Sequence, residues 1–154
     1  MGLLIQGRLG KLRWRHQRPT KEDFIYRRVP FADKNFVRPD GSLTSACYEL
    51  KKDKQTGRLD KGVSVDLCRL TGWEGSITRN RGNLKSHRLL RVSIKDINAS
   101  EYDLGYLDDR LWSNRAHGLI IGEKLAKSPA RKFLCSKSLK VAAPRYWGEP
   151  SCHA

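Results

Sequence analysis

The sequence lacks the features that mark a metal site or a membrane protein. Its four cysteines contain no C-x-x-C pair, the spacing with which one tight turn supplies two ligands to zinc. We therefore expect no metal, and we interpret the cysteines as thiols in a reducing cytoplasm. No apolar run approaches the ~18 residues of a transmembrane helix. At the N-terminus the apolar residues precede the basic ones, the reverse of a secretory signal, so we expect a cytoplasmic protein without membrane contact.

The motifs of common enzymes are also missing. The chain has no G-x-S-x-G, no Walker loop, no H-E-x-x-H and no G-x-G-x-x-G between a strand and a helix. Its carboxylates concentrate only over residues 101–109, a pattern more typical of a solvated acidic loop than of a two-metal nuclease site. These absences favour a binding protein over an enzyme.

What the chain has in excess is positive charge. Its 31 Lys and Arg oppose 16 Asp and Glu, for a net charge of +15 and a pI near 10.1. Such an excess favours a polyanionic partner, most commonly nucleic acid. The signs are segregated: residues 1–31, 69–95 and 114–154 each carry +6, whereas 96–113 carry −4. Segregation of this kind predicts one or more basic faces.

The length and composition predict a single domain between two terminal extensions. We place a basic arm at residues 1–20, one domain at 21–143 and a C-terminal tail at 144–154. Glycines and Pro19 oppose a long helix in the arm. Two alternatives remain for it: a disordered tail, or a segment that becomes ordered on phosphates.

Hydrophobic periodicity predicts an α+β fold. Strands are expected over residues 23–29, 63–67, 87–95 and 117–122, while 43–50 fits either a strand or a short helix. Residues 72–83 contain three glycines and few apolar residues, which predicts a loop. Ser128-Pro129 has the pattern of a helix start, with Ser128 as the N-cap. We expect a small, mostly antiparallel sheet with one or two helices and the basic N-terminal arm.

The first functional hypothesis is a phosphate-directed RNA- or DNA-binding protein. No zinc finger or helix-turn-helix is evident, so binding would be largely independent of sequence. The same charges would equally suit a subunit of a ribonucleoprotein or defence complex, or an accessory subunit bound to an acidic protein. The expected contacts are basic side chains and two stacking tryptophans: Arg13, Trp14, Arg15, Arg18, Trp73, Arg79, Arg81, Lys85, Arg88, Arg131 and Lys132.

A second hypothesis starts from polar residues in apolar strands. Arg27 and Arg28 are neighbours in a strand, so one of them points at the core or emerges at a site. Ser64 interrupts the alternating strand, and His117 precedes an apolar one. Each also has a structural explanation, such as a paired arginine, a backbone-bonded hydroxyl or a capping histidine. Together they form the alternative catalytic set, with no cofactor expected unless that set is used.

Four short motifs carry a resemblance to known proteins. Tyr26-Arg27-Arg28, the Gly41–Ala46 segment, Ser64-Val65-Asp66 and the Ala116–Gly122 segment resemble the ordered landmarks of a group of small uncharacterised bacterial proteins. The resemblance spans about residues 24–126 and implies a bacterial intracellular setting.

A looser similarity connects the chain with the ADP-ribosyltransferase-like toxins. In that family an arginine or histidine on the first strand, a serine on a second strand and a late acidic residue hold NAD. The similarity implies that Arg27 or Arg28 and Ser64 fill the first two positions, with Glu123 as the candidate acid. It implies NAD as the cofactor and a toxin or effector activity as the alternative function.

The nucleic-acid hypothesis predicts a strong salt dependence. Neutralising ~6 phosphates should make log affinity fall with log salt at a slope near −5. A titration of the protein with single- and double-stranded oligonucleotides measures this slope. A slope near zero would contradict the hypothesis.

Overall fold

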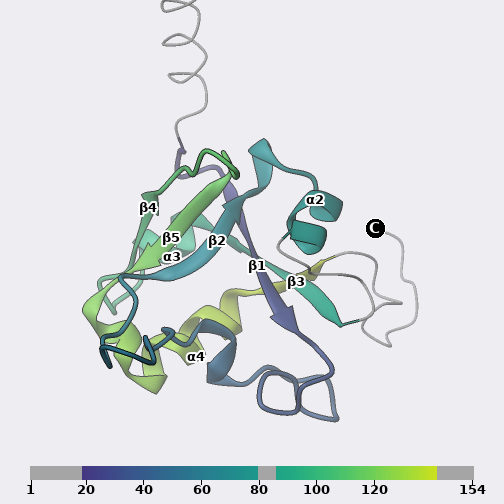
Figure 1. The fold of residues 1–154 in the computed structure, drawn as a ribbon, viewed down its shortest axis with the longest axis vertical. Helices are drawn as coiled ribbons and strands as arrows, with labels where there is room; N and C mark the ends of the chain where they lie inside the picture. The colour runs from purple at the N-terminus through teal and green to yellow at the C-terminus, as the bar shows by residue number, and fades with distance from the viewer. Residues whose placement is uncertain (1–18, 80–85, 142–154) are drawn as a thin grey trace, which may run out of the picture.

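One antiparallel sheet organises the described part of the chain. The computed structural model describes residues 19–79 and 86–141, which contain β1 (Phe24–Pro30), β2 (Val63–Leu67), β3 (His87–Ser93), β4 (Gly105–Asp108), β5 (His117–Ile121) and β6 (Leu139–Val141) (Figure 1). The strand order is β4-β5-β2-β1-β3-β6, and neighbouring strands pair antiparallel throughout. The expected α+β class is confirmed. Residues 1–18 of the expected arm and the whole tail at 144–154 lie outside the described residues.

Short helices connect and cover the strands. They are α2 (Trp73–Thr78), α3 (Ile94–Asn98) and α4 (Ser128–Lys137), with 3₁₀ turns η1 (Ser45–Tyr48), η2 (Cys68–Leu70) and η4 (Glu123–Ala126). Of the two alternatives expected for residues 43–50, a strand or a short helix, the structure shows the short helix. Helix α4 begins at the expected Ser128-Pro129, although Lys127 rather than Ser128 occupies the N-cap position. In the described ranges no helix has the length and apolar character needed to cross a bilayer.

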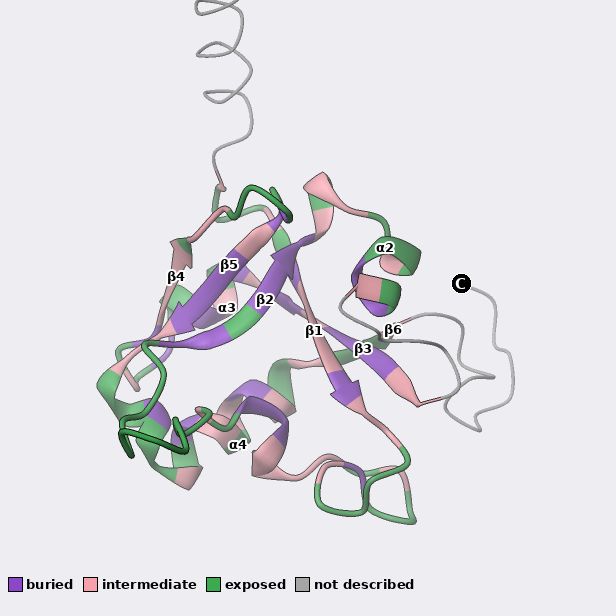
Figure 2. Ribbon diagram, viewed as in Figure 1, coloured by how far each residue is buried: buried purple, intermediate pink, exposed green. Residues whose placement is uncertain are grey.

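The main core lies on one face of the sheet. Strand alternation turns Ile25 and Val29 of β1 and Leu90 and Val92 of β3 toward this face, where all four are buried. Helix α4 covers them with its apolar side, as its periodicity predicts, and Leu134 is fully buried (Figure 2).

Helix α2 covers the opposite face and corrects one expectation. Residues 72–83 were expected to form a loop, but Trp73–Thr78 is a helix that lies against β1 and β3. Ile77 on α2 and Leu89 on β3 are both completely buried. A helix forms here because burial of Ile77 against Leu89 outweighs the weak helix preference of a glycine-containing segment.

Strand β3 also ends earlier than the pattern of apolar residues predicts. The strand was expected to reach Lys95, but the Ser93 hydroxyl accepts a hydrogen bond from the Asp96 amide at 3.0 Å and caps α3. Serine at an N-cap position thus ends the strand and starts the helix. Strands β4 and β6 were not predicted from the sequence.

The sheet is divided between β1 and β2. Strand β1 pairs with β3 along all seven of its residues, but it pairs with β2 only at Ile25–Leu67 and Tyr26–Asp66. Strand β2 continues along β5 instead, and Figure 1 shows β1 and β2 diverging beyond their short contact. The backbone edges of two central strands are thereby left facing a gap.

Two glycines in the outer strands should differ in how well they tolerate a side chain. A Cβ on Gly118 of β5 would lie within 3 Å of the Tyr106 ring of β4, whereas one on Gly105 would meet Ile121 at an ordinary 3.8 Å. We expect Gly118→Ala to destabilise the protein by about 1–3 kcal/mol through overpacking. Gly105→Ala should change the free energy of unfolding little. Urea denaturation of both variants measures the difference, and equal effects would contradict this packing.

Candidate functional site

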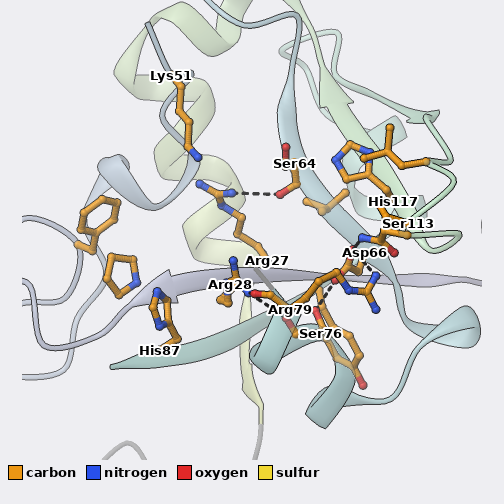
Figure 3. Close-up of a pocket in the computed structure, with 16 residues that line it drawn as sticks. Arg27, Arg28, Lys51, Ser64, Asp66, Ser76, Arg79, His87, Ser113 and His117 are labelled. Atoms are coloured by element: carbon orange, nitrogen blue, oxygen red, sulfur yellow. Dashed lines mark hydrogen bonds and ion pairs between the residues drawn. The ribbon is translucent and has the colours of Figure 1, made fainter. Parts of the chain in front are cut away.

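A cavity of about 420 Å³ opens where β1 and β2 diverge (Figure 3). We call it the β1–β2 cavity. It brings together the four residues of the alternative catalytic set, which come from three strands: Arg27, Arg28, Ser64 and His117. Its remaining lining includes polar and charged side chains from segments that are distant in sequence: Lys51, Asp66, Ser76, Arg79, His87, Ser113 and Asn114.

Arg27 bridges the gap between the two strands. By alternation it lies on the core face of β1, and its guanidinium reaches back to the gap. Nε donates to the Cys47 carbonyl at 2.9 Å. Nη1 donates to the Ser64 carbonyl at 3.1 Å, the bond drawn between Arg27 and Ser64 in Figure 3. The Ser64 carbonyl is a β2 acceptor that pairing with β1 would otherwise satisfy. Burial lowers the pKa of Arg27, but an arginine remains protonated in proteins.

Arg28 points to the other face and holds the end of α2. Its Nη1 donates to the carbonyls of Ser76 and Ile77 at 3.4 Å each and also to that of Arg79. The last carbonyls of a helix lack partners within the helix and carry partial negative charge, so the half-buried guanidinium of Arg28 suits them. Burial lowers the pKa of Arg28 as well. The sequence expectation that the two arginines take opposite faces is confirmed.

A buried carboxylate joins three segments beside the cavity. Asp66 is only 9% exposed and accepts hydrogen bonds from Ser76 Oγ at 2.6 Å and Asn114 Nδ2 at 2.8 Å. Arg79 Nη1 lies 3.9 Å from the same carboxylate. Sequence analysis named Asp66 only within the Ser64-Val65-Asp66 motif and assigned it no role. The signal was a charged residue inside an otherwise apolar strand.

His117 has one ring nitrogen fixed and the other turned to the cavity. Nδ1 lies 2.8 Å from the backbone carbonyl of Asp109 and 3.3 Å from a carboxylate oxygen of the same residue. Because a carbonyl only accepts, Nδ1 carries the hydrogen. In the neutral ring Nε2 is then the proton acceptor.

A second histidine, His87, lines the cavity with a neutral ring. His87 Nδ1 lies 2.7 Å from Ser86 Oγ. Burial, reinforced by the nearby Arg28, lowers the pKa of His87 below its ordinary 6.5. His87 is therefore neutral at pH 7, while the arginines and Lys51 supply the positive charge.

The cavity as a whole attracts anions. Three arginines and Lys51 line it, against the single carboxylate of Asp66. That carboxylate is already hydrogen-bonded and close to Arg79, so the excess charge in the cavity is positive. A concave site lined by one sign of charge concentrates ligands of the opposite sign.

The structure disperses the described candidates for nucleic-acid contacts. Arg79 lines the β1–β2 cavity, and Trp73 is half-buried at the start of α2. Arg88 is only 6% exposed, with its guanidinium 3.7 Å from the centroid of the Phe31 ring. Arg131 on α4 pairs with Glu49 at 3.4 Å, and its neighbour Lys132 is exposed. Because α2 and α4 cover opposite faces of the sheet, these residues do not form one surface.

The remaining candidates belong to other parts of the chain. They lie in the terminal and internal ranges outside the described residues: Arg13, Trp14, Arg15, Arg18, Arg81 and Lys85. Glu123, the candidate acid of the toxin similarity, is exposed at the start of η4 and does not line the cavity.

Comparisons with known proteins leave the interpretation to the geometry. No protein-family model matches the chain, and neither the curated proteins nor the solved structures contain a match.

Within residues 19–79 and 86–141, no three His, Cys, Asp or Glu side chains gather in a way that could hold a metal ion.

The suppressed charge of His87 predicts a pH dependence. An unfolded histidine takes up a proton near pH 6.5, but the folded His87 resists protonation, so its contribution to stability falls as pH drops below 6.5. Removing the neighbouring charge in Arg28→Gln should raise the His87 pKa toward 6.5, whereas Arg28→Lys should leave it low. NMR titration of the His87 ring measures these values. An ordinary pKa in the unmodified protein would contradict the arrangement.

Proposed function

We propose that the protein binds a phosphate-bearing nucleotide in the β1–β2 cavity and that this nucleotide is NAD⁺. The observation that carries the proposal is the divergence of β1 from β2, which gathers Arg27, Arg28, Ser64 and His117 around one cavity. The adjacent Arg27 and Arg28 lie far from Ser64 and from His117 in sequence, and all four were singled out as polar residues in or beside apolar strands.

The size and charge of the cavity support a nucleotide. Small-molecule sites usually measure ~300–1,000 Å³, and this cavity is about 420 Å³. Arginine is suited to phosphate because its planar guanidinium carries several donors and keeps its charge. Arg27 uses Nε and Nη1 for the protein, while Nη2 has no hydrogen bond to a described residue and can serve a phosphate.

The strand positions of two residues support NAD⁺ in particular. Arg27 on β1 and Ser64 on β2 face each other across the gap, consistent with the similarity to ADP-ribosyltransferase-like toxins. The acidic position of that similarity is not filled by Glu123, which is exposed outside the cavity. His117 Nε2 is instead the group that can accept a proton.

The proposed reaction transfers ADP-ribose. The bond between C1′ of the ribose and nicotinamide breaks, and nicotinamide leaves with the electron pair. A nucleophilic atom of the acceptor, or water, forms the new bond to C1′ and loses its proton to Nε2 of His117. Arg27 and Arg28 hold the pyrophosphate, and Ser64 Oγ bonds the ribose beside the reacting carbon.

This proposal predicts different effects for two substitutions. His117→Asn can retain a donor toward the Asp109 carbonyl but removes Nε2, so nicotinamide release should fall roughly 10²-fold or more with little change in NAD⁺ affinity. Ser64→Ala removes an exposed hydroxyl and should weaken NAD⁺ binding. Nicotinamide release measured by chromatography and NAD⁺ binding measured by calorimetry separate the two effects.

The matched control is Lys132→Ala, an exposed residue of α4 that does not line the cavity. It should leave both quantities unchanged. If folded protein neither binds nor cleaves NAD⁺, in the presence or absence of cell lysate as a source of acceptors, the proposal is wrong.

Nucleic-acid binding is the second candidate, and the net charge of +15 supports it. Eight of the 31 basic residues and one of the 16 acidic ones lie outside the described ranges, so much of this excess belongs to those segments. A cytoplasmic role within a ribonucleoprotein or defence complex agrees with such a charge. The salt titration described above tests this candidate.

A further inference from the structure

A tryptophan stands fully exposed beside the β1–β2 cavity. Trp112 is 96% exposed, at the tip of the connection between β4 and β5. Its neighbours Leu111 and Ser113 both line the cavity, and Leu111 is itself 44% exposed. An indole is a large apolar surface to leave in water, and aromatic residues exposed beside a pocket commonly mark a binding site.

The backbone holds this tryptophan in place. The amides of Leu111 and Asn114 each donate to the other's carbonyl at 3.0 Å, closing a tight turn around Trp112 and Ser113. The Asn114 side chain is fixed in turn, since Nδ2 donates to Asp66 at 2.8 Å and Oδ1 accepts from the Ala116 amide at 3.1 Å. The turn that carries the indole is thus tied to the buried carboxylate behind the cavity.

We infer that Trp112 is the stacking platform for the base of the bound nucleotide, an inference that rests on the proposed function. The cations of the cavity, among them Arg27 and Arg28, draw the phosphates inward and leave the heterocyclic base toward the rim. A flat indole on the turn whose Leu111 and Ser113 line the cavity matches the one part of a nucleotide that is flat and weakly polar. Stacking on tryptophan is tolerant of base identity, because every base has a π-face.

The test compares AMP with ribose 5-phosphate, which share the phosphate and the ribose but differ in the base. Calorimetry should show that the unmodified protein binds AMP roughly 5-fold or more tightly than ribose 5-phosphate. Trp112→Ala should abolish that preference by weakening AMP binding alone. Trp112→Tyr, which keeps an aromatic face, should retain most of it. Leu139→Ala removes another exposed apolar side chain, on β6, and should change neither affinity.

The outcomes separate this inference from the proposed function. Because Trp112 is exposed, its replacement should not shift the thermal unfolding midpoint. Suppose that the unmodified protein binds both ligands. If Trp112→Ala then leaves the preference for AMP intact, or lowers the affinity for both ligands equally, the stacking role is wrong and the phosphate site stands. If the unmodified protein binds neither ligand, nor NAD⁺, the proposed function and the stacking role both fail.

Discussion

The short contact between β1 and β2 is the constraint on which the rest of the structure depends. Two central strands of a continuous sheet would normally satisfy each other's backbone groups, but here they pair at only two positions. Arg27 compensates by donating from one guanidinium to the Cys47 and Ser64 carbonyls across the gap. The residue that stabilises the opening also places its positive charge within it, so the fold and the site share one interaction.

The other groups around the β1–β2 cavity combine structural and functional roles in the same way. Arg28 holds the C-terminal end of α2, and Asp66 joins β2 to α2 and to the β4–β5 connection. These bonds fix the positions of the charges before a ligand arrives, and preorganised charges need no reorganisation when a ligand binds. Besides the positive charge of Arg28, the groups that remain for a ligand are Nη2 of Arg27, Oγ of Ser64 and Nε2 of His117.

The sequence predicted those features of the fold that local patterns determine. Alternation in residues 63–67 and the Ser128-Pro129 pair were sufficient to locate β2 and α4. Helix α2 was missed because its six residues depend on the burial of Ile77 against the sheet, a contact absent from any local pattern. The polar residues Arg27, Arg28, Ser64 and His117 were recognised one by one. Their convergence could not be, because it follows from the strand order and from how far β1 and β2 stay paired.

The most direct test of this account is to map NAD⁺ binding onto the backbone amides by NMR. The account predicts that the amide chemical-shift changes concentrate in residues 26–28, 64–66 and 111–117, three of the segments that line the β1–β2 cavity. Shifts confined to the outer surface of α4, or none at millimolar NAD⁺, would contradict a nucleotide site in the divided sheet.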